Sequence, residues 1–191
     1  MATKRYRWTV DVERDWGGRT NAVRGLTYGL PKILEIFSKY SVKGLFFIST
    51  ELLRNNSREI AAITKAGHEV GSHGHFHHVW DDWYRAEEDR QISLALLSAM
   101  FGDKSFEYRA PKFSHKTVSQ YSDKSHHTSL LRQLWAPQPI TNSTIFYVHP
   151  FDIINDRKPP SLFCRAWYSR PKEALSLLER LVKAYSGDQR L

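Results

Sequence analysis

The sequence has a single cysteine, Cys164, and no long hydrophobic run, and each shortage excludes a class of protein. One cysteine cannot form an internal disulfide, so a disulfide framework is excluded and a reducing compartment is expected. We interpret Cys164 as a packed apolar residue. No apolar stretch approaches the roughly 20 residues that cross a membrane, so no transmembrane segment is predicted.

Internal repeats, low-complexity tracts and linkers are also lacking. The basic residues near Met1 are not followed by an apolar segment, so we predict no signal peptide and expect a cytoplasmic location. A chain of 191 residues with 41% hydrophobic residues can bury one ample core. We therefore expect a single domain over residues 1–191.

Acidic residues are fewer than basic ones, 20 against 28, which gives a formal net charge of +8. This balance favours anionic partners, among them nucleic acids, acidic glycans and phospholipid headgroups. The positive residues are scattered, and only short clusters such as residues 4–7 occur. The pattern indicates a solvated basic surface, and no specific nucleic-acid partner is expected.

Short β-rich segments alternate with segments of helical periodicity. Strands are predicted over residues 7–12, 42–48, 68–72, 106–109 and 145–148. Helices are predicted over residues 25–40, 51–66, 83–100 and 173–185, with Pro31 in a first turn. Residues 114–128 are polar and irregular. The alternation predicts an α/β fold with a parallel sheet or barrel.

Residues 71–78 read Gly-Ser-His-Gly-His-Phe-His-His and are the most informative segment of the chain. His73 and His77 follow a short apolar run and, four residues apart, can aim at one point. Such a pair suits a divalent metal that prefers imidazole nitrogen, zinc first. The alternative for this pair alone is a polar surface loop, and His75 and His78 are interpreted as loop residues.

Three further segments place reactive side chains at the carboxyl ends of predicted strands. An acidic segment over residues 11–15 follows the first strand, and Arg109 and His149 end two later strands. Sites in α/β barrels assemble at this edge. The acidic segment offers a third ligand beside the histidines, and two histidines with one carboxylate leave a position open for water, as in catalytic zinc sites.

These residue types together are suited to hydrolysing an amide or an ester. A second carboxylate near the metal can take a proton from water, and Arg109 can keep that carboxylate ionised. Taken alone, Arg109 is more often a structural ion-pair partner. His149 can stay protonated and donate to a leaving amine, and N–H groups after Pro111 can bind an oxyanion.

Tryptophan residues are candidates for a sugar-binding groove, because pyranose faces stack on aromatic rings. Each tryptophan taken alone is more often part of the core or the surface. The candidates for such a groove are Trp16, Trp80, Trp83, Trp135 and Trp167.

These segments, in this order, resemble the polysaccharide deacetylase family, the NodB-homology domain of carbohydrate esterase family 4. The matching segments are Thr9–Glu13, Gly67–His77, Tyr108–Ser114 and Tyr147–Pro150. The resemblance implies a distorted (β/α) barrel of the polysaccharide deacetylase type, with fewer than eight regular strands. It also implies a metal-dependent hydrolase that removes an acetyl group from an N-acetylated, less often O-acetylated, sugar.

The resemblance assigns roles by position in this sequence. These are Asp11 as general base, Arg109 as its orienting partner, His149 as general acid, His73 and His77 as metal ligands, the Lys112 N–H as oxyanion donor, and Phe113 as a substrate contact. The cofactor implied is one divalent metal, zinc first, with cobalt, nickel and manganese as alternatives. The partner implied is an N-acetylated sugar, a glycan or a lipid-linked glycan, and the oligomeric state is not indicated.

Two departures from the commonest family pattern matter. The usual second aspartate is replaced by Val12, which keeps a catalytically inactive glycan-binding domain as the alternative. A subset of the family spaces its acids as Asp-x-Asp or Asp-x-Glu, which makes Glu13 the acidic ligand. Asp15 is the second choice, because strand alternation places residues 11, 13 and 15 on one face. The residue that supports His149 is left open between Asp123 and Trp135.

Overall fold

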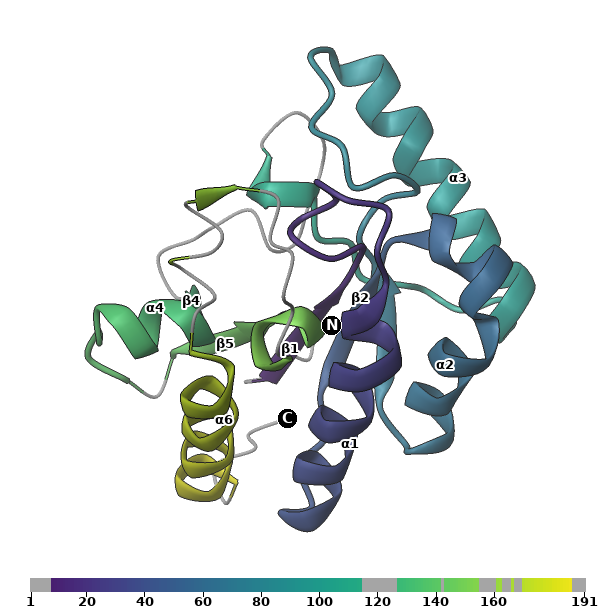
Figure 1. Cartoon of the computed structure of the whole chain (residues 1–191). Helices are drawn as coiled ribbons and strands as arrows, with labels where there is room; N and C mark the ends of the chain where they lie inside the picture. The colour runs from purple at the N-terminus through teal and green to yellow at the C-terminus, as the bar shows by residue number, and fades with distance from the viewer. Residues whose placement is uncertain are drawn as a thin grey trace.

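The structure is a computed structural model that describes residues 8–114, 127–141, 143–154, 161–162, 166 and 170–186. At its centre lies a five-stranded sheet with the strand order β3-β2-β1-β5-β4 (Figure 1). The strands are β1 Trp8–Val12, β2 Leu45–Ile48, β3 Glu69–Ser72, β4 His127–Ser129 and β5 Ile145–Val148. Each neighbouring pair is parallel, so the carboxyl ends of the strands share one edge.

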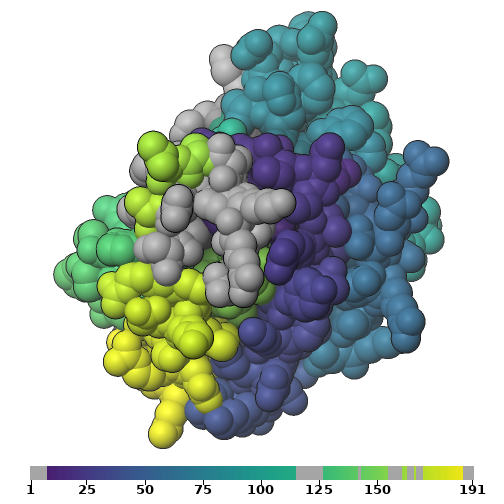
Figure 2. Space-filling view, in the orientation of Figure 1, coloured from purple at the N-terminus to yellow at the C-terminus, as the bar shows by residue number. Residues whose placement is uncertain are grey.

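Helices connect and cover these strands. They are α1 Leu30–Lys39, α2 Leu53–Lys65, α3 Trp83–Phe101, α4 Leu130–Trp135 and α6 Pro171–Tyr185. Helices α2 and α3 contact β3. Helix α1 lies beside α6, as both views show (Figures 1 and 2). The described part also contains the short helical turns η1 Gly25–Gly29, η2 Thr50–Leu52, η3 Pro111–Phe113 and η4 Pro150–Ile153.

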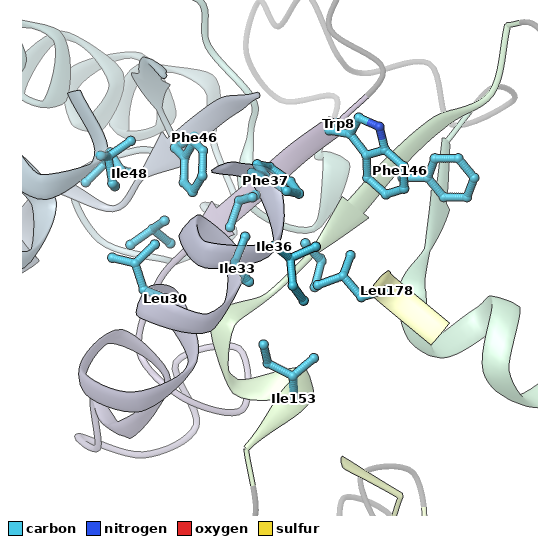
Figure 3. Packing of buried hydrophobic residues seen from close by; sticks show 14 of the residues in the cluster. Trp8, Leu30, Ile33, Ile36, Phe37, Phe46, Ile48, Phe146, Ile153 and Leu178 are labelled. Atoms are coloured by element: carbon cyan, nitrogen blue, oxygen red, sulfur yellow. The ribbon is translucent and has the colours of Figure 1, made fainter. Parts of the chain in front are cut away.

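One buried cluster joins the strands to the helices on the sheet, and Figure 3 shows part of it, around α1 and α6. Trp8 of β1 stacks on Phe146 of β5, with ring centroids 4.6 Å apart, and also contacts Phe37 of α1. Leu178 of α6 joins the same buried cluster. Each fully buried side chain of this size contributes roughly 1.5–3 kcal/mol. Strands β1 and β2, in the middle of the sheet, are buried on both faces, as expected of a parallel sheet covered by helices.

The predicted α/β fold with a parallel sheet of fewer than eight strands is confirmed. The strand predicted over residues 106–109 is wrong, because only Tyr108 forms a bridge, to Ser72. Strand β4 and helix α4 were not predicted. The remaining predicted helices agree with the structure to within a few residues, and Pro31 lies in the first turn of α1.

Several predictions fall on residues outside the described part, namely those on Cys164, Asp123 and Trp167 and most of the irregular segment at 114–128. Among the helices that are described, none combines the length and the apolar character needed to cross a bilayer.

Candidate active site

The carboxyl edge of the sheet brings the predicted site residues together. Asp11 lies on β1 and Glu13 follows it, while His73 follows β3 and His149 follows β5. These side chains face a cavity of about 380 Å³. Its described lining consists of Asp11, Glu13, Trp16, Gly17, Arg19, His73, His77, Lys112, Phe113, His127, Arg132, Tyr147, His149 and Phe151.

Glu13, His73 and His77 form a compact group at this edge. The Glu13 Oε2 atom lies 2.6 Å from His77 Nε2 and 3.3 Å from His73 Nε2. One ligand atom from each of the three residues lies within 4.8 Å of the others. Glu13 and His73 are buried and His77 is half-buried. In the described part of the chain, this is the group with the side chains and spacing of a metal site.

Backbone carbonyls fix which ring nitrogen of each histidine carries the proton. His73 Nδ1 lies 2.8 Å from the Arg109 carbonyl oxygen, and His77 Nδ1 lies 3.1 Å from the Gly17 carbonyl oxygen. A carbonyl only accepts, so both Nδ1 atoms donate. In the neutral rings, both Nε2 lone pairs therefore point toward Glu13, and such carbonyl-backed histidines are typical metal ligands.

The electrostatics of Glu13 agree with this arrangement. Burial raises the pKa of Glu13, but His77 and His73 outweigh it and hold the pKa of that carboxyl well below its usual range. The carboxylate is therefore ionised at neutral pH. In the absence of a metal, protons on the facing Nε2 atoms stabilise this charge. A divalent cation such as zinc can replace them, because one carboxylate oxygen and two imidazole nitrogens converge on one point.

The loop that carries the two histidines is held by helix α3. Asp89 of α3 accepts hydrogen bonds from the N–H groups of His75 and Phe76, at 2.8 and 3.0 Å. Gly74 lies between the ligands with a φ of 81°, which favours glycine. A Cβ there would lie 2.6 Å from an Asp89 carboxyl oxygen. The chain thus turns sharply enough for both imidazoles to face one side.

Asp11 lies beside this group but has a different partner. Arg109 donates from Nη1 to Asp11 Oδ1 at 2.6 Å and from Nη2 to Thr9 Oγ1 at 2.9 Å. Its guanidinium carbon lies 4.2 Å from the centre of the Phe47 ring. Burial raises the pKa of Asp11, yet Arg109, and then His73 and His149, bring it below its ordinary value. Asp11 is therefore a buried but ionised carboxylate.

His149 receives its support from Asp152, a residue that the sequence analysis missed. Asp152 Oδ2 lies 3.3 Å from His149 Nδ1 and accepts the His149 backbone N–H at 2.8 Å. Burial lowers the pKa of His149, but Asp152, Glu13 and Asp11 together raise it to about 10. The signal was present in the sequence, because an acid three residues after the start of a helical turn is a capping pattern.

Of the two candidates proposed for the support of His149, the structure describes only Trp135. Trp135 is on α4, is 41% exposed and lies beneath the guanidinium of Arg170. Asp123 lies outside the described residues. The prediction for Trp135 is therefore wrong.

Asp15, the second choice for the acidic ligand, is used elsewhere. Its carboxylate accepts the backbone N–H groups of Arg24 and Gly25, both at 2.9 Å, at the start of η1. The alternation of a strand does not continue past Val12, where β1 ends. Glu13 is thus the acid that the structure brings to the two histidines.

Lys112 and Phe113 both line the cavity, in turn η3. Their φ angles are 53° and 55°, in the left-handed region that residues with a Cβ seldom adopt. The first hydrogen bond of this turn is donated by the Phe113 N–H to the Ala110 carbonyl, at 3.0 Å. The Lys112 N–H is one residue earlier and takes no part in that bond. Strained backbone of this kind clusters at functional sites.

Most aromatic residues that line the cavity are not among the five tryptophans proposed for a sugar-binding groove. Trp16 lines the cavity, whereas Trp80 packs on His78 and Trp83 packs on Tyr84. The predicted groove of tryptophans is thus wrong for the described members other than Trp16. Residues that line the cavity and were given no role from sequence are Gly17, Arg19, His127, Arg132, Tyr147 and Phe151.

Comparisons with known proteins agree with this geometry. The profile of the family described as polysaccharide deacetylase matches residues 24–130. A peptidoglycan deacetylase from Helicobacter pylori is 37% identical over 93 residues, 48% of this chain and 32% of that protein. The chain thus matches about a third of the length of this curated relative.

Solved structures share the fold. A family 4 acetyl xylan esterase from Clostridium thermocellum, in complex with a cobalt ion, superposes with a TM-score of 0.57 at 17% identity, over 93% of this chain and 82% of that one. A family 4 pseudoenzyme from Bacillus anthracis superposes with a TM-score of 0.54 at 16% identity, over 91% of this chain and 60% of that one. These likenesses confirm the predicted distorted barrel.

Proposed function

The chain belongs to the polysaccharide deacetylase family, and on this premise we propose that it is a metal-dependent hydrolase of an acetylated sugar. The reaction removes an acetyl group from an N-acetylated, less often O-acetylated, sugar in a glycan or a glycan precursor. The observation that carries the proposal is a pair of buried carboxylates with different partners. Asp11 is paired with Arg109, while Glu13 faces His73 and His77.

Glu13, His73 and His77 would hold the metal, with zinc first among the candidates. The fit rests on the two Nε2 atoms that converge on the Glu13 carboxylate, while both Nδ1 atoms are bonded to backbone carbonyls. A bound divalent cation supplies a Lewis acid, which lowers the pKa of water and polarises a carbonyl group. Glu13 fills the role that Val12 cannot, because it is the next acid along the chain.

Asp11 acts as general base. It is ionised because Arg109 offsets the cost of burying its charge, and it faces the same cavity as Glu13. The carboxylate takes a proton from water as the water oxygen bonds to the acetyl carbonyl carbon. Arg109 is fixed by Thr9 and by the Phe47 ring, so the carboxylate is held in one orientation.

His149 acts as general acid from the other side of the cavity. Its Nε2 atom lies 3.9 Å from Glu13 Oε1, so it borders the metal-binding group. With a pKa raised to about 10, the ring is protonated at neutral pH. The Nε2 proton passes to the sugar nitrogen as the C–N bond breaks, and acetate and a free amine leave. Asp152 holds the ring by Nδ1 and stabilises its charge.

The remaining lining residues position the substrate. The Lys112 N–H is the oxyanion donor, and a preorganised N–H of this kind is worth about 3 kcal/mol in related chemistry. Phe113 and Trp16 give the cavity apolar faces against which a sugar ring packs. We place all of these parts in one catalytic domain over residues 1–191. The cytoplasmic location expected from the sequence stays a prediction.

Acetate release from a panel of N-acetylated and O-acetylated sugars tests the proposal. The protein is loaded with zinc or cobalt, and acetate is measured with an enzymatic assay. Asp11→Asn should lower kcat by about 100-fold or more while the bound metal is kept. Asp103→Asn, an exposed acid beyond α3, is the matched control and should retain full activity. Unchanged turnover in Asp11→Asn would refute the mechanism.

A catalytically inactive glycan-binding domain is the second candidate. Val12 in the place of the usual acid and the likeness to a family 4 pseudoenzyme favour it. The ionised Asp11 and the complete Glu13, His73 and His77 group weigh against it. Acetate release by the metal-loaded protein excludes this candidate, whereas sugar binding without acetate release supports it.

A further inference from the structure

Three exposed cationic side chains line the same cavity from three different segments. Arg19 comes from the turn after β1, Lys112 from η3 and Arg132 from α4. The carboxylates in the described lining are those of Asp11 and Glu13, and both are buried. Among the described residues that line the cavity, the exposed charged side chains are therefore all positive.

The buried carboxylates do not neutralise these exposed cations. Asp11 is paired with Arg109 at 2.6 Å, and Glu13 is paired with His77 at the same distance. Within the described part of the chain, neither Lys112 nor Arg132 has a side-chain salt bridge. Two cations at the cavity are thus available to a ligand, and a metal on Glu13 would add further positive charge.

The backbone conformation at Lys112 supports a role for its side chain at the cavity. Glycine would adopt its φ of 53° at lower cost, yet a lysine stands there and its side chain lines the cavity. Arg132 belongs to the first turns of α4, whose start is capped by Ser129 Oγ at 3.0 Å. Both cations are therefore attached to ordered backbone beside the site.

We propose that the preferred substrate is an acetylated sugar that carries a negative charge, a carboxylate or a phosphate, beside the acetylated position. Arg19, Lys112 and Arg132 would bind that charge. The inference rests on the proposed deacetylase function and specifies its substrate class. A neutral acetylated sugar offers these side chains no counter-charge, whereas an arginine fork matches a carboxylate or a phosphate.

Three substrates of similar size test the inference. They are the methyl glycoside of N-acetylglucosamine, which is neutral, N-acetylglucosamine 1-phosphate, and N-acetylmuramic acid, which carries a carboxylate. The full chain is loaded with zinc, and kcat/KM is measured by acetate release at low ionic strength. We expect at least one anionic substrate to exceed the neutral one by about 10-fold, and the ratio to fall as salt is added.

Charge-removing variants connect this preference to the cavity. Arg132→Gln and Lys112→Gln should each reduce the anionic-to-neutral ratio by about 3- to 5-fold. Lys65→Gln is the matched control. It removes the same charge from the last turn of α2, which leads to the amino end of β3 at the opposite edge of the sheet. Its ratio should equal that of the unmodified protein.

The outcomes separate the inference from the proposed function. Equal kcat/KM for all three sugars overturns the inference and leaves the deacetylase function standing. An equal loss of preference in Lys65→Gln also overturns it, since net charge alone would then explain the effect. If no sugar releases acetate, the function fails, and calorimetric binding of the same sugars decides the inference. Tighter binding of an anionic sugar supports it, and equal binding overturns it.

Discussion

Asp11 and Glu13 are two residues apart, and the different side chains that face them give each a separate chemistry. Asp11 faces the guanidinium of Arg109, which is protonated at every accessible pH. Glu13 faces two imidazole nitrogens that can bind a metal. Asp11 is thus suited to proton transfer and Glu13 to metal binding. The identity of the facing residue, rather than burial, separates the two carboxylates.

The pairing of Asp11 with Arg109 predicts strong energetic coupling. Arg109→Met leaves a buried carboxylate without its counter-charge, and the free energy of unfolding should fall by about 3–5 kcal/mol. Asp11→Ala combined with Arg109→Met should lose less than the sum of the single changes, by about 2 kcal/mol. Urea unfolding of the four proteins measures this coupling. Additive losses would show that the two side chains do not interact.

The support of His149 by Asp152 predicts a shift in pH dependence. His149 must be protonated to act as an acid, so activity is present below its pKa and is lost as the pH rises through it. Asp152→Asn removes the negative charge that raises that pKa, so the basic limb of kcat/KM should move to lower pH by about one to two units.

The measurement for Asp152→Asn is acetate release between pH 6 and about pH 11, the range that brackets a pKa of about 10. Asp81→Asn, an exposed acid outside the cavity lining, is the control. An unmoved basic limb in Asp152→Asn would remove His149 from the role of general acid.

At the scale of helices and strands, segments with a clear period could be predicted from the sequence. Apolar residues at helical spacing predicted α1, and short β-rich runs predicted β1, β2, β3 and β5. Strand β4 spans only His127–Ser129, and α4 only Leu130–Trp135. Elements this short have too few residues to display a hydrophobic periodicity, and their formation depends on tertiary packing.

The contact between α3 and the histidine loop predicts that a helix residue controls metal affinity. Asp89→Ala removes the acceptor for the N–H groups of His75 and Phe76. Zinc affinity should fall by about 10- to 100-fold, because the loop no longer holds both ligands in place. Glu88→Gln, the exposed neighbour on the same helix, should bind zinc as before.

Zinc titration of the Asp89→Ala and Glu88→Gln variants, with circular dichroism as a check on folding, measures the effect. Substitution of Asp89 by Asn should restore part of the affinity, since the amide oxygen accepts one of the two N–H groups. Equal zinc affinity in Asp89→Ala and the unmodified chain would mean that the loop holds its shape without α3.

At the scale of the whole molecule, the sequence could predict those site residues that lie at the carboxyl ends of the parallel strands. Asp11, His73 and His149 were expected at strand ends, and a parallel sheet brings strand ends together. Arg109 was also expected at a strand end, but it follows an isolated bridge from Tyr108 to Ser72 and reaches the site through its bond to Asp11. The cationic lining from Arg132 could not be predicted, because α4 itself was not. The place of Asp15 could not be predicted either, since it depends on where η1 begins relative to β1.

Buried His68 predicts how the stability of the whole fold depends on pH. Its ring packs on Phe37 and Phe46, and its Nδ1 accepts the Gly44 N–H at 3.3 Å, which requires a neutral ring. Burial, and then Lys43, lower the pKa of His68 from 6.5 to about 4. The unfolded chain therefore binds the proton more readily, so stability is full above pH 6.5 and is lost as the pH falls toward 4.

Denaturant unfolding at pH 7 and at pH 5, in chelator, measures this contribution. His68→Asn keeps an acceptor for the Gly44 N–H but cannot titrate. The unmodified protein should lose about 1–2 kcal/mol more than this variant between the two pH values. Equal losses would show that His68 is already protonated, or freely protonated, in the folded state.

The central claim is that Glu13, His73 and His77 together bind one divalent metal. Calorimetric titration of zinc into the metal-free protein tests it most directly, with Glu13→Gln and His77→Ala beside a His78→Ala control. The account predicts one site in the unmodified chain and in His78→Ala, and affinity at least about 100-fold weaker in the other two variants. Zinc binding of equal strength in Glu13→Gln and the unmodified chain would contradict it.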